Sequence, residues 1–189
     1  MALALAHKGL EVESIEISYE DRSEVERVSG QGLVPVIVED GEVVADSTRI
    51  LRHLEDRHPF PALFPTEVAR RAELDVFLEW FDEVWKGPPN EIATELATRQ
   101  PDQDRVSALA GQMEGWLRLF ERMLEDREYL FGDFSAADCA AFPFLKFATM
   151  RDPDDDELFH RVLDDYQDAE RLPNLAAWIE RVDERPRAG

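Results

Sequence analysis

The chain has 189 residues, of which 44% are hydrophobic and 33% charged, a balance typical of a folded globular protein. Its formal net charge of −21 disfavours non-specific binding to nucleic acid or to an anionic membrane surface. No apolar run is long enough to span a bilayer, so we expect a cytoplasmic protein without a membrane partner. The single cysteine, Cys139, excludes an intramolecular disulfide, and the four histidines show no metal-ligand spacing, so we expect no metal site.

The first residues read as the end of a helix followed by a strand. Residues 1–8 have a helical composition, and Gly9 is a plausible left-handed stop. Residues 12–17 alternate apolar and polar side chains and predict a strand. Residues 20–28 are polar, with two valines three apart, and predict a short helix or an irregular segment.

The next stretch, residues 33–54, predicts a hairpin that leads into a helix. Pro35 precedes three β-branched residues, at a strand start where its missing N–H costs no ladder bond. Asp40-Gly41 is a two-residue turn signal of the type I′ kind, and a second short strand follows it.

Asp46-Ser47 then offers two capping side chains at the start of the helix. Taken alone, this pair is most simply a helix cap.

Three prolines fall within residues 59–65, which no helix or central strand tolerates, and we interpret this segment as a linker. The expected domains are therefore residues 1–58 and residues 66–189. The second is expected to be all helical, because its apolar residues recur at helical spacing. Helices are expected over residues 67–86, 102–128, 135–150 and 175–182, with a further one opening at residues 154–156.

Ser135 and Asp138 form a capping-box pattern ahead of an almost wholly apolar helix, with Phe134 placed as a staple residue. A buried helix must satisfy its first N–H groups internally, since no water reaches them. We therefore assign this pair a folding role and no chemistry. Cys139 lies in the same helix and is expected to be a packed thiol.

Five pieces in this order resemble the cytosolic glutathione S-transferase superfamily. They lie at residues 4–10, 32–36, 45–51, 134–138 and 172–182. No single piece is specific, but together they span nearly the whole chain. The resemblance implies an α+β, thioredoxin-like N-terminal domain followed by an all-α C-terminal domain. It also implies glutathione as co-substrate, a role in detoxification and a homodimer.

The resemblance also implies where glutathione would bind. Val34 would pair its backbone with the cysteinyl part, and Pro35 would be cis. Asp46 and Ser47 would hold the γ-glutamyl end, which carries both an ammonium and a carboxylate. A carboxylate suits free N–H groups at a helix N-terminus, and an aspartate suits the ammonium. In this context we favour the binding role over the simple cap.

No residue of this sequence takes the family's thiol-activating role. Members of the family begin with a strand and a loop that carries Ser, Tyr or Cys, whereas this sequence starts inside the first helix. Ser14, Tyr19 and Ser29 all follow that helix and do not match the position. The resemblance thus predicts an N-terminal truncation, either from an internal Met taken as the start or from a true loss.

Two functions follow as hypotheses. The first is a transferase that adds glutathione to small hydrophobic electrophiles, with aromatic residues of the helical domain as candidates to line the electrophile site. These candidates are Phe77, Phe81, Trp85 and Phe147. Core packing is the alternative for each of them and is the favoured one. The second function is a non-catalytic binding or interaction module of the same fold, because fold does not fix function.

Overall fold

The computed structural model describes residues 1–18 and 21–189 and divides into two compact units. Unit 1 comprises Met1–Glu67 together with Arg185–Gly189, and unit 2 comprises Val68–Glu184. The division falls close to the expected linker. It differs from the expected domains at the C-terminus, where the last five residues belong to unit 1.

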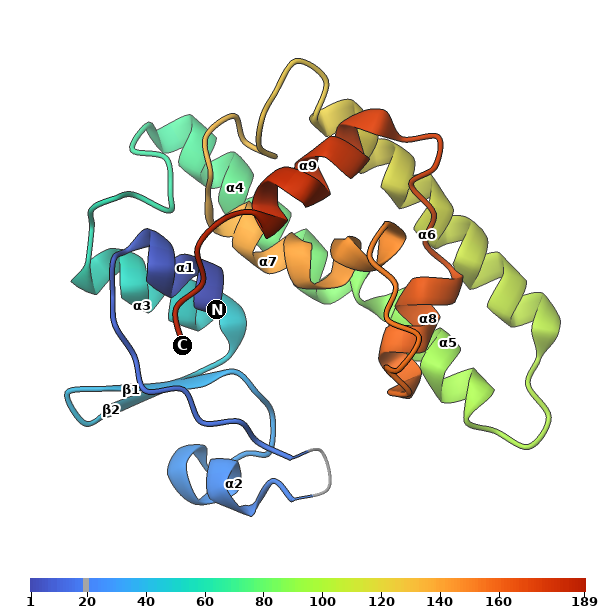
Figure 1. Cartoon of the computed structure of the whole chain (residues 1–189), viewed down its shortest axis with the longest axis horizontal. Helices are drawn as coiled ribbons and strands as arrows, with labels where there is room; N and C mark the ends of the chain where they lie inside the picture. Colours follow the sequence, from blue (N-terminus) through green and yellow to red (C-terminus); the bar gives the residue numbers. More distant parts are fainter. Residues whose placement is uncertain (19–20) are drawn as a thin grey trace. The chain divides into compact units, whose positions relative to one another are not determined.

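Unit 1 is a small α+β unit with one two-stranded sheet among its described residues (Figure 1). Its elements are α1 (Ala2–His7), α2 (Ser23–Ser29), β1 (Val36–Glu39), β2 (Glu42–Ala45) and α3 (Ser47–Arg57). The expected stop at Gly9 is confirmed, with φ +69°, a region that glycine enters without steric cost. Gly30 likewise ends α2 in a left-handed conformation.

The β1–β2 hairpin forms as the sequence predicts. Asp40 and Gly41 both have positive φ, 50° and 82°, as a type I′ turn requires. The strands pair antiparallel, and α3 packs on them through an apolar face that includes Ile50 and Leu54. Val44 is the buried residue of β2 and faces this small core.

The strand expected over residues 12–17 is wrong. This segment has no assigned helix or strand, and Ile15 keeps 61% of its surface exposed. Strand structure requires a hydrogen-bonded neighbour, and within the described residues nothing pairs with this backbone. Of the segment expected at residues 20–28, residue 20 lies outside the described residues, residues 21 and 22 have no assigned helix or strand, and residues 23–28 are helical in α2.

Unit 2 is helical. Its elements are α4 (Val68–Trp80), η1 (Phe81–Trp85, a π-helix), α5 (Gly87–Leu96), α6 (Gln103–Met123), α7 (Ala136–Leu145), η2 (Lys146–Ala148, a 3₁₀-helix), α8 (Leu158–Asp165) and α9 (Pro173–Asp183). None of the helices in the described part of the chain is long and apolar enough to cross a membrane.

Two details of unit 2 differ from expectation. None of the expected helices covers residues 87–96, yet α5 begins at Gly87-Pro88-Pro89, because proline is tolerated in the first turn, where its N–H would be unpaired anyway. The three aspartates at residues 154–156 do not open a helix either. Glu157 caps α8 instead, accepting the His160 N–H at 2.7 Å.

Asp138 is the fully buried polar centre of unit 2. One carboxylate oxygen accepts the Leu130 N–H at 3.0 Å and the Trp178 indole N–H at 2.8 Å. The other accepts the Ser135 N–H at 2.9 Å and the Ser135 hydroxyl at 3.0 Å. The expected capping box is therefore present and extends to a second helix, since Trp178 lies on α9. Burial raises the pKa of Asp138 against the effect of these four donors.

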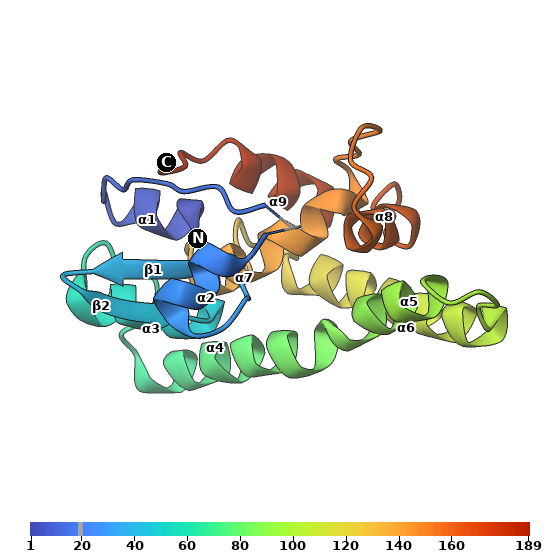
Figure 2. The same ribbon diagram turned by 90° about the horizontal axis from the view of Figure 1, so that it is seen from below.

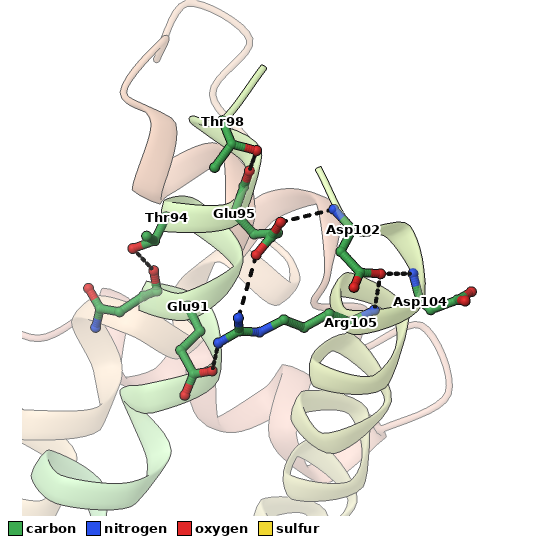
Figure 3. A network of polar contacts seen from close by, with 8 residues as sticks. Glu91, Thr94, Glu95, Thr98, Asp102, Asp104 and Arg105 are labelled. Carbon is green, nitrogen blue, oxygen red and sulfur yellow. Dashed lines mark hydrogen bonds and ion pairs between the residues drawn. The ribbon is translucent and has the colours of Figure 1, made fainter. Parts of the chain in front are cut away.

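The α5–α6 pair is joined by an exposed polar network (Figure 3). The Arg105 guanidinium reaches Glu91 at 2.9 Å and Glu95 at 3.7 Å. Asp102 caps α6 by accepting the N–H groups of residues 104 and 105. Neighbouring carboxylates, Glu91 foremost, raise the pKa of Arg105. Exposed pairs of this kind contribute little stability each and mainly fix the pairing of the two helices.

A buried ion pair holds the proline-rich segment of residues 59–65 against α1 and α3 within unit 1. Lys8 Nζ lies 2.6 Å from Glu55 Oε2 and donates to the Pro61 carbonyl at 2.7 Å. The same Glu55 oxygen accepts the Leu63 N–H at 2.8 Å. Thus α1, α3 and the proline segment all meet at Glu55.

The C-terminal tail also belongs to this unit. The Ala188 N–H donates to the Ala2 carbonyl, and Arg185 donates to His7 Nδ1 at 3.2 Å. Burial lowers the pKa of His7, in keeping with a neutral ring that accepts from Arg185.

Candidate functional site

The hairpin register brings the predicted glutathione residues to one place. Val36 pairs with Ala45, so Pro35 and Asp46 are the next residues beyond the same end of the hairpin. Val34 and Ser47 flank them in sequence. The site therefore consists of the loop that enters β1 and the first turn of α3, at the hairpin end opposite the Asp40-Gly41 turn (Figure 2).

The Val34–Pro35 peptide bond is cis, as the resemblance implies. Val34 is 50% exposed, and its main chain makes no hydrogen bond within the described residues. The preceding residue is held by Gln31, whose amide oxygen accepts the Leu33 N–H and whose amide nitrogen donates to the Leu33 carbonyl at 2.8 Å. This clamp fixes the loop and leaves the backbone of Val34 available to an extended peptide.

The first turn of α3 supplies the polar half of the site. Asp46 is the N-cap and accepts the Arg49 N–H at 2.9 Å through one carboxylate oxygen. Several polar groups beside this bond have no hydrogen-bond partner in the part of the chain that the structure describes. They are the second carboxylate oxygen of Asp46, the Ser47 hydroxyl and the N–H groups of residues 47 and 48. An acceptor and several donors therefore stand together, as a ligand with one ammonium and one carboxylate requires.

Asp46 also has an unusual backbone, with φ 81° and ψ 127°. A residue other than glycine held at positive φ costs on the order of 1–3 kcal/mol, and such residues cluster at functional sites. This conformation and the Gln31 clamp are the two features of the site that the sequence did not predict. The only signal for the clamp is Gln31 itself, a polar residue between the two glycines that break the chain before the hairpin.

A second polar cluster fastens the other end of the hairpin to α3. The Glu39 carboxylate lies 2.6 Å from His53 Nε2 and 2.6 Å from His58 Nε2. Hydrogen bonding from His58 and then from His53 lowers the pKa of Glu39 against the effect of desolvation. No group of His, Cys, Asp and Glu in the described residues has an arrangement that would hold a metal ion.

Replacing Glu39 with glutamine is expected to reduce the acid sensitivity of unit 1. Since the folded-state pKa of Glu39 is lowered, its carboxylate stabilises the fold above the ordinary glutamate pKa, and this stabilisation is lost as the pH falls through the folded value. The loss should amount to roughly 0.5–1 kcal/mol between about pH 5 and pH 3.

Calorimetric unfolding over this pH range measures the effect, with Glu13→Gln as the matched control because Glu13 is exposed. Parallel pH profiles for wild type and Glu39→Gln would contradict the role of the cluster.

The four aromatic candidates for an electrophile site lie in the interior of unit 2. Phe77, Phe81, Trp85 and Phe147 are 7%, 1%, 0% and 5% exposed. Phe81 stacks on Trp85 with ring centroids 4.6 Å apart, and Phe77 packs on Phe81 at 5.9 Å. These are the positions that core packing predicts.

Cys139, Ser14 and Ser29 are each placed as structural or exposed residues and not at the candidate site. Cys139 is buried in α7, as expected for a packed thiol. Ser14 is exposed, and the Ser29 hydroxyl donates to the Val25 and Gln31 carbonyls. Tyr19 lies outside the described residues.

Comparison with known proteins supports one family. A model of the glutathione S-transferase N-terminal domain matches residues 1–62, and a model of the C-terminal domain of the same proteins matches residues 103–181. Protein LigF of Sphingobium sp. (strain NBRC 103272 / SYK-6) is 25% identical over 222 residues, which cover 96% of this chain and 83% of LigF. Glutathione S-transferase L1 of Arabidopsis thaliana is 26% identical over 161 residues, which cover 83% of this chain but only 59% of that protein.

The fold is shared with solved structures as well. A glutathione S-transferase from Methylobacterium radiotolerans, solved in complex with glutathione sulfonate, matches with a TM-score of 0.75 and 26% identity. The match covers 98% of this chain and 84% of the other.

Proposed function

Because the chain belongs to the glutathione S-transferase superfamily, we propose that unit 1 binds glutathione at Val34, Pro35, Asp46 and Ser47. The observation that carries this proposal is the hairpin register, which joins an unpaired backbone at Val34 to the free donors and acceptor of the α3 N-terminus.

Each part of glutathione has a matching group. The γ-glutamyl carboxylate meets the N–H groups of residues 47 and 48 and the Ser47 hydroxyl, in the positive field of the helix N-terminus. The γ-glutamyl ammonium pairs with the free oxygen of Asp46. The cysteinyl residue pairs with the Val34 backbone as a short extended strand. The thiol then lies beside Pro35, where the cysteinyl side chain leaves the main chain.

Asp46→Asn is expected to weaken glutathione binding by about tenfold, since a charge-assisted bond to the ammonium is replaced by a neutral one. Asparagine caps helices as well as aspartate does, so α3 should keep its stability. Ser47→Ala is expected to weaken binding several-fold, by about the value of one hydrogen bond.

Isothermal titration with glutathione measures both effects. Ser107→Ala, an exposed serine of α6, is the matched control. Unchanged affinity in Asp46→Asn, with wild-type stability, would show that the site assignment is wrong.

We further propose that the bound thiol is transferred to small hydrophobic electrophiles. The support is family membership, and conjugation of a chlorodinitrobenzene probe is the direct assay. The second candidate is a non-catalytic module that binds glutathione without transfer. It remains a candidate because a fold does not fix function. Titration together with the conjugation assay separates the two candidates, since only the first predicts turnover.

Two properties complete the proposal. The protein is cytoplasmic, and it forms a homodimer. The charge of −21 on each chain opposes pairing, so added salt should favour the dimer by screening the repulsion.

A further inference from the structure

Gln31 lies in the loop that joins α2 to β1, shortly before Val34 (Figure 1). Its side-chain amide oxygen accepts the Leu33 N–H, and its amide nitrogen donates to the Leu33 carbonyl at 2.8 Å. The same nitrogen donates to the Ser29 hydroxyl at 3.1 Å. One side chain therefore makes the two backbone bonds that a residue of a neighbouring strand makes in a hydrogen-bonded pair.

Ser29 connects this amide to α2. Its hydroxyl donates to the Val25 carbonyl at 2.8 Å and to the Gln31 carbonyl at 2.9 Å. The side chain of Val25 is buried, and α2 packs against β2. The loop is thereby held to the same hairpin from which Asp46 leads into α3.

The bonds to Gln31 determine which way the backbone of Val34 faces. Both polar groups of Leu33 reach one side chain, so they point to the same side, as in an extended strand. Val34 precedes a proline and is therefore also biased towards an extended conformation. Since successive residues of an extended chain direct their polar groups to opposite sides, the N–H and C=O of Val34 face away from Gln31.

Side-chain packing does not hold the loop in this position. Leu33 is 77% exposed, so its side chain contributes little to fixing the backbone. Gly32 passes close to α2, where a Cβ would lie 3.3 Å from Glu26 Oε1. The position of the loop therefore depends on the polar bonds of Gln31 and on this close approach.

We propose that Gln31 is a positioning residue for glutathione, which acts through its two bonds to Leu33 and holds the Val34 backbone in the orientation that pairs with the cysteinyl residue. This inference rests on the glutathione binding proposed above and adds a residue that raises affinity through the loop. A loop that is already ordered does not have to be fixed when the ligand binds, so less of the interaction free energy is lost. Ser29 supports Gln31 in this role.

Isothermal titration with glutathione is the first test. Gln31→Ala is expected to weaken binding by about five- to tenfold, since both bonds to Leu33 are lost. Ser29→Ala leaves those two bonds in place and is expected to weaken binding by only about twofold. Gln112→Ala, at an exposed glutamine of α6, is the matched control and should bind as the wild type does.

A glutathione analogue with an ester in place of the γ-glutamyl–cysteinyl amide separates positioning from a general structural effect. The analogue lacks the cysteinyl N–H that would pair with the Val34 carbonyl. It is expected to bind the wild type about tenfold more weakly than glutathione does. In Gln31→Ala the same ester should weaken binding by only about two- to threefold, because the Val34 carbonyl is no longer held towards the ligand.

Gln31→Glu is a second variant, which keeps the acceptor for the Leu33 N–H. At pH 7 the introduced carboxylate has no proton to donate to the Leu33 carbonyl, so glutathione affinity should fall several-fold. Protonation of this carboxyl restores a donor, so the difference from wild type should narrow as the pH falls towards about 4.5. A role confined to stability would not produce this convergence.

The outcomes distinguish this inference from the proposed function. If the wild type does not bind glutathione, both are wrong. If the wild type binds and folded Gln31→Ala or Gln31→Glu binds equally well, Gln31 does not position the loop, although the glutathione site stands. An equal ester effect in wild type and Gln31→Ala, or parallel pH profiles for wild type and Gln31→Glu, would likewise overturn the positioning role alone.

Discussion

Lys8→Met is expected to destabilise unit 1 by about 3–5 kcal/mol, the cost of removing one partner from a buried ion pair. The Lys8 side chain is fully buried and that of Glu55 is 9% exposed. Methionine fills a similar volume, so the main change is the uncompensated charge left on Glu55. That charge sits where α1, α3 and the linker meet, so all three should loosen together.

Hydrogen exchange measured by mass spectrometry is the suitable readout. Tryptophan fluorescence does not report on unit 1, because all four tryptophans lie in unit 2: Trp80, Trp85, Trp116 and Trp178. Amides of α1 and α3 should lose protection. The control is Lys86→Met, which removes a half-exposed pair with Asp82 and should cost about 1 kcal/mol or less.

Adding Glu55→Gln to Lys8→Met should recover part of the loss. Glutamine removes the uncompensated charge at residue 55 and keeps an acceptor for the Leu63 N–H. A double variant that is less stable than Lys8→Met would show that the charge on Glu55 is not the source of the cost.

The sequence predicted those elements whose signals are local. The hairpin follows from Asp40-Gly41 between β-branched residues, and the start of α3 follows from Asp46. The hairpin register then places the candidate site without further information. The Gln31 clamp and the strained backbone of Asp46 could not be predicted, because both depend on how the loop meets the hairpin in three dimensions.

The strand predicted over residues 12–17 is absent for a different reason, because its signal is local but a strand is not. Its alternating pattern is a genuine strand signal, but a pattern specifies only which side chains face which side. A strand also needs a neighbour, and the described residues supply none. The missed start of α5 is a simpler case, since proline breaks a helix interior but is favourable in the first turn.

Replacing Asp138 with alanine is expected to destabilise unit 2 by about 3–5 kcal/mol. A lost helix cap alone costs about 0.5–2 kcal/mol. The larger value is expected because the substitution leaves four buried hydrogen-bond donors without an acceptor. These donors belong to Leu130, Ser135 and Trp178. No water reaches these groups, so each loses a partner without replacement.

Urea unfolding followed by tryptophan fluorescence measures this loss, and Trp178 reports it directly because its indole N–H bonds to Asp138. Asp104→Ala, an exposed acid in the first turn of α6, is the matched control and should cost less than about 0.5 kcal/mol. Glutathione affinity of the folded variant should equal that of wild type, since Asp138 lies in unit 2 and the proposed site in unit 1. A loss of stability no larger than that for an ordinary helix cap would mean that Asp138 acts only as a cap of α7. A loss near 4 kcal/mol would mean that the same carboxylate holds α7, α9 and the segment at Leu130 together.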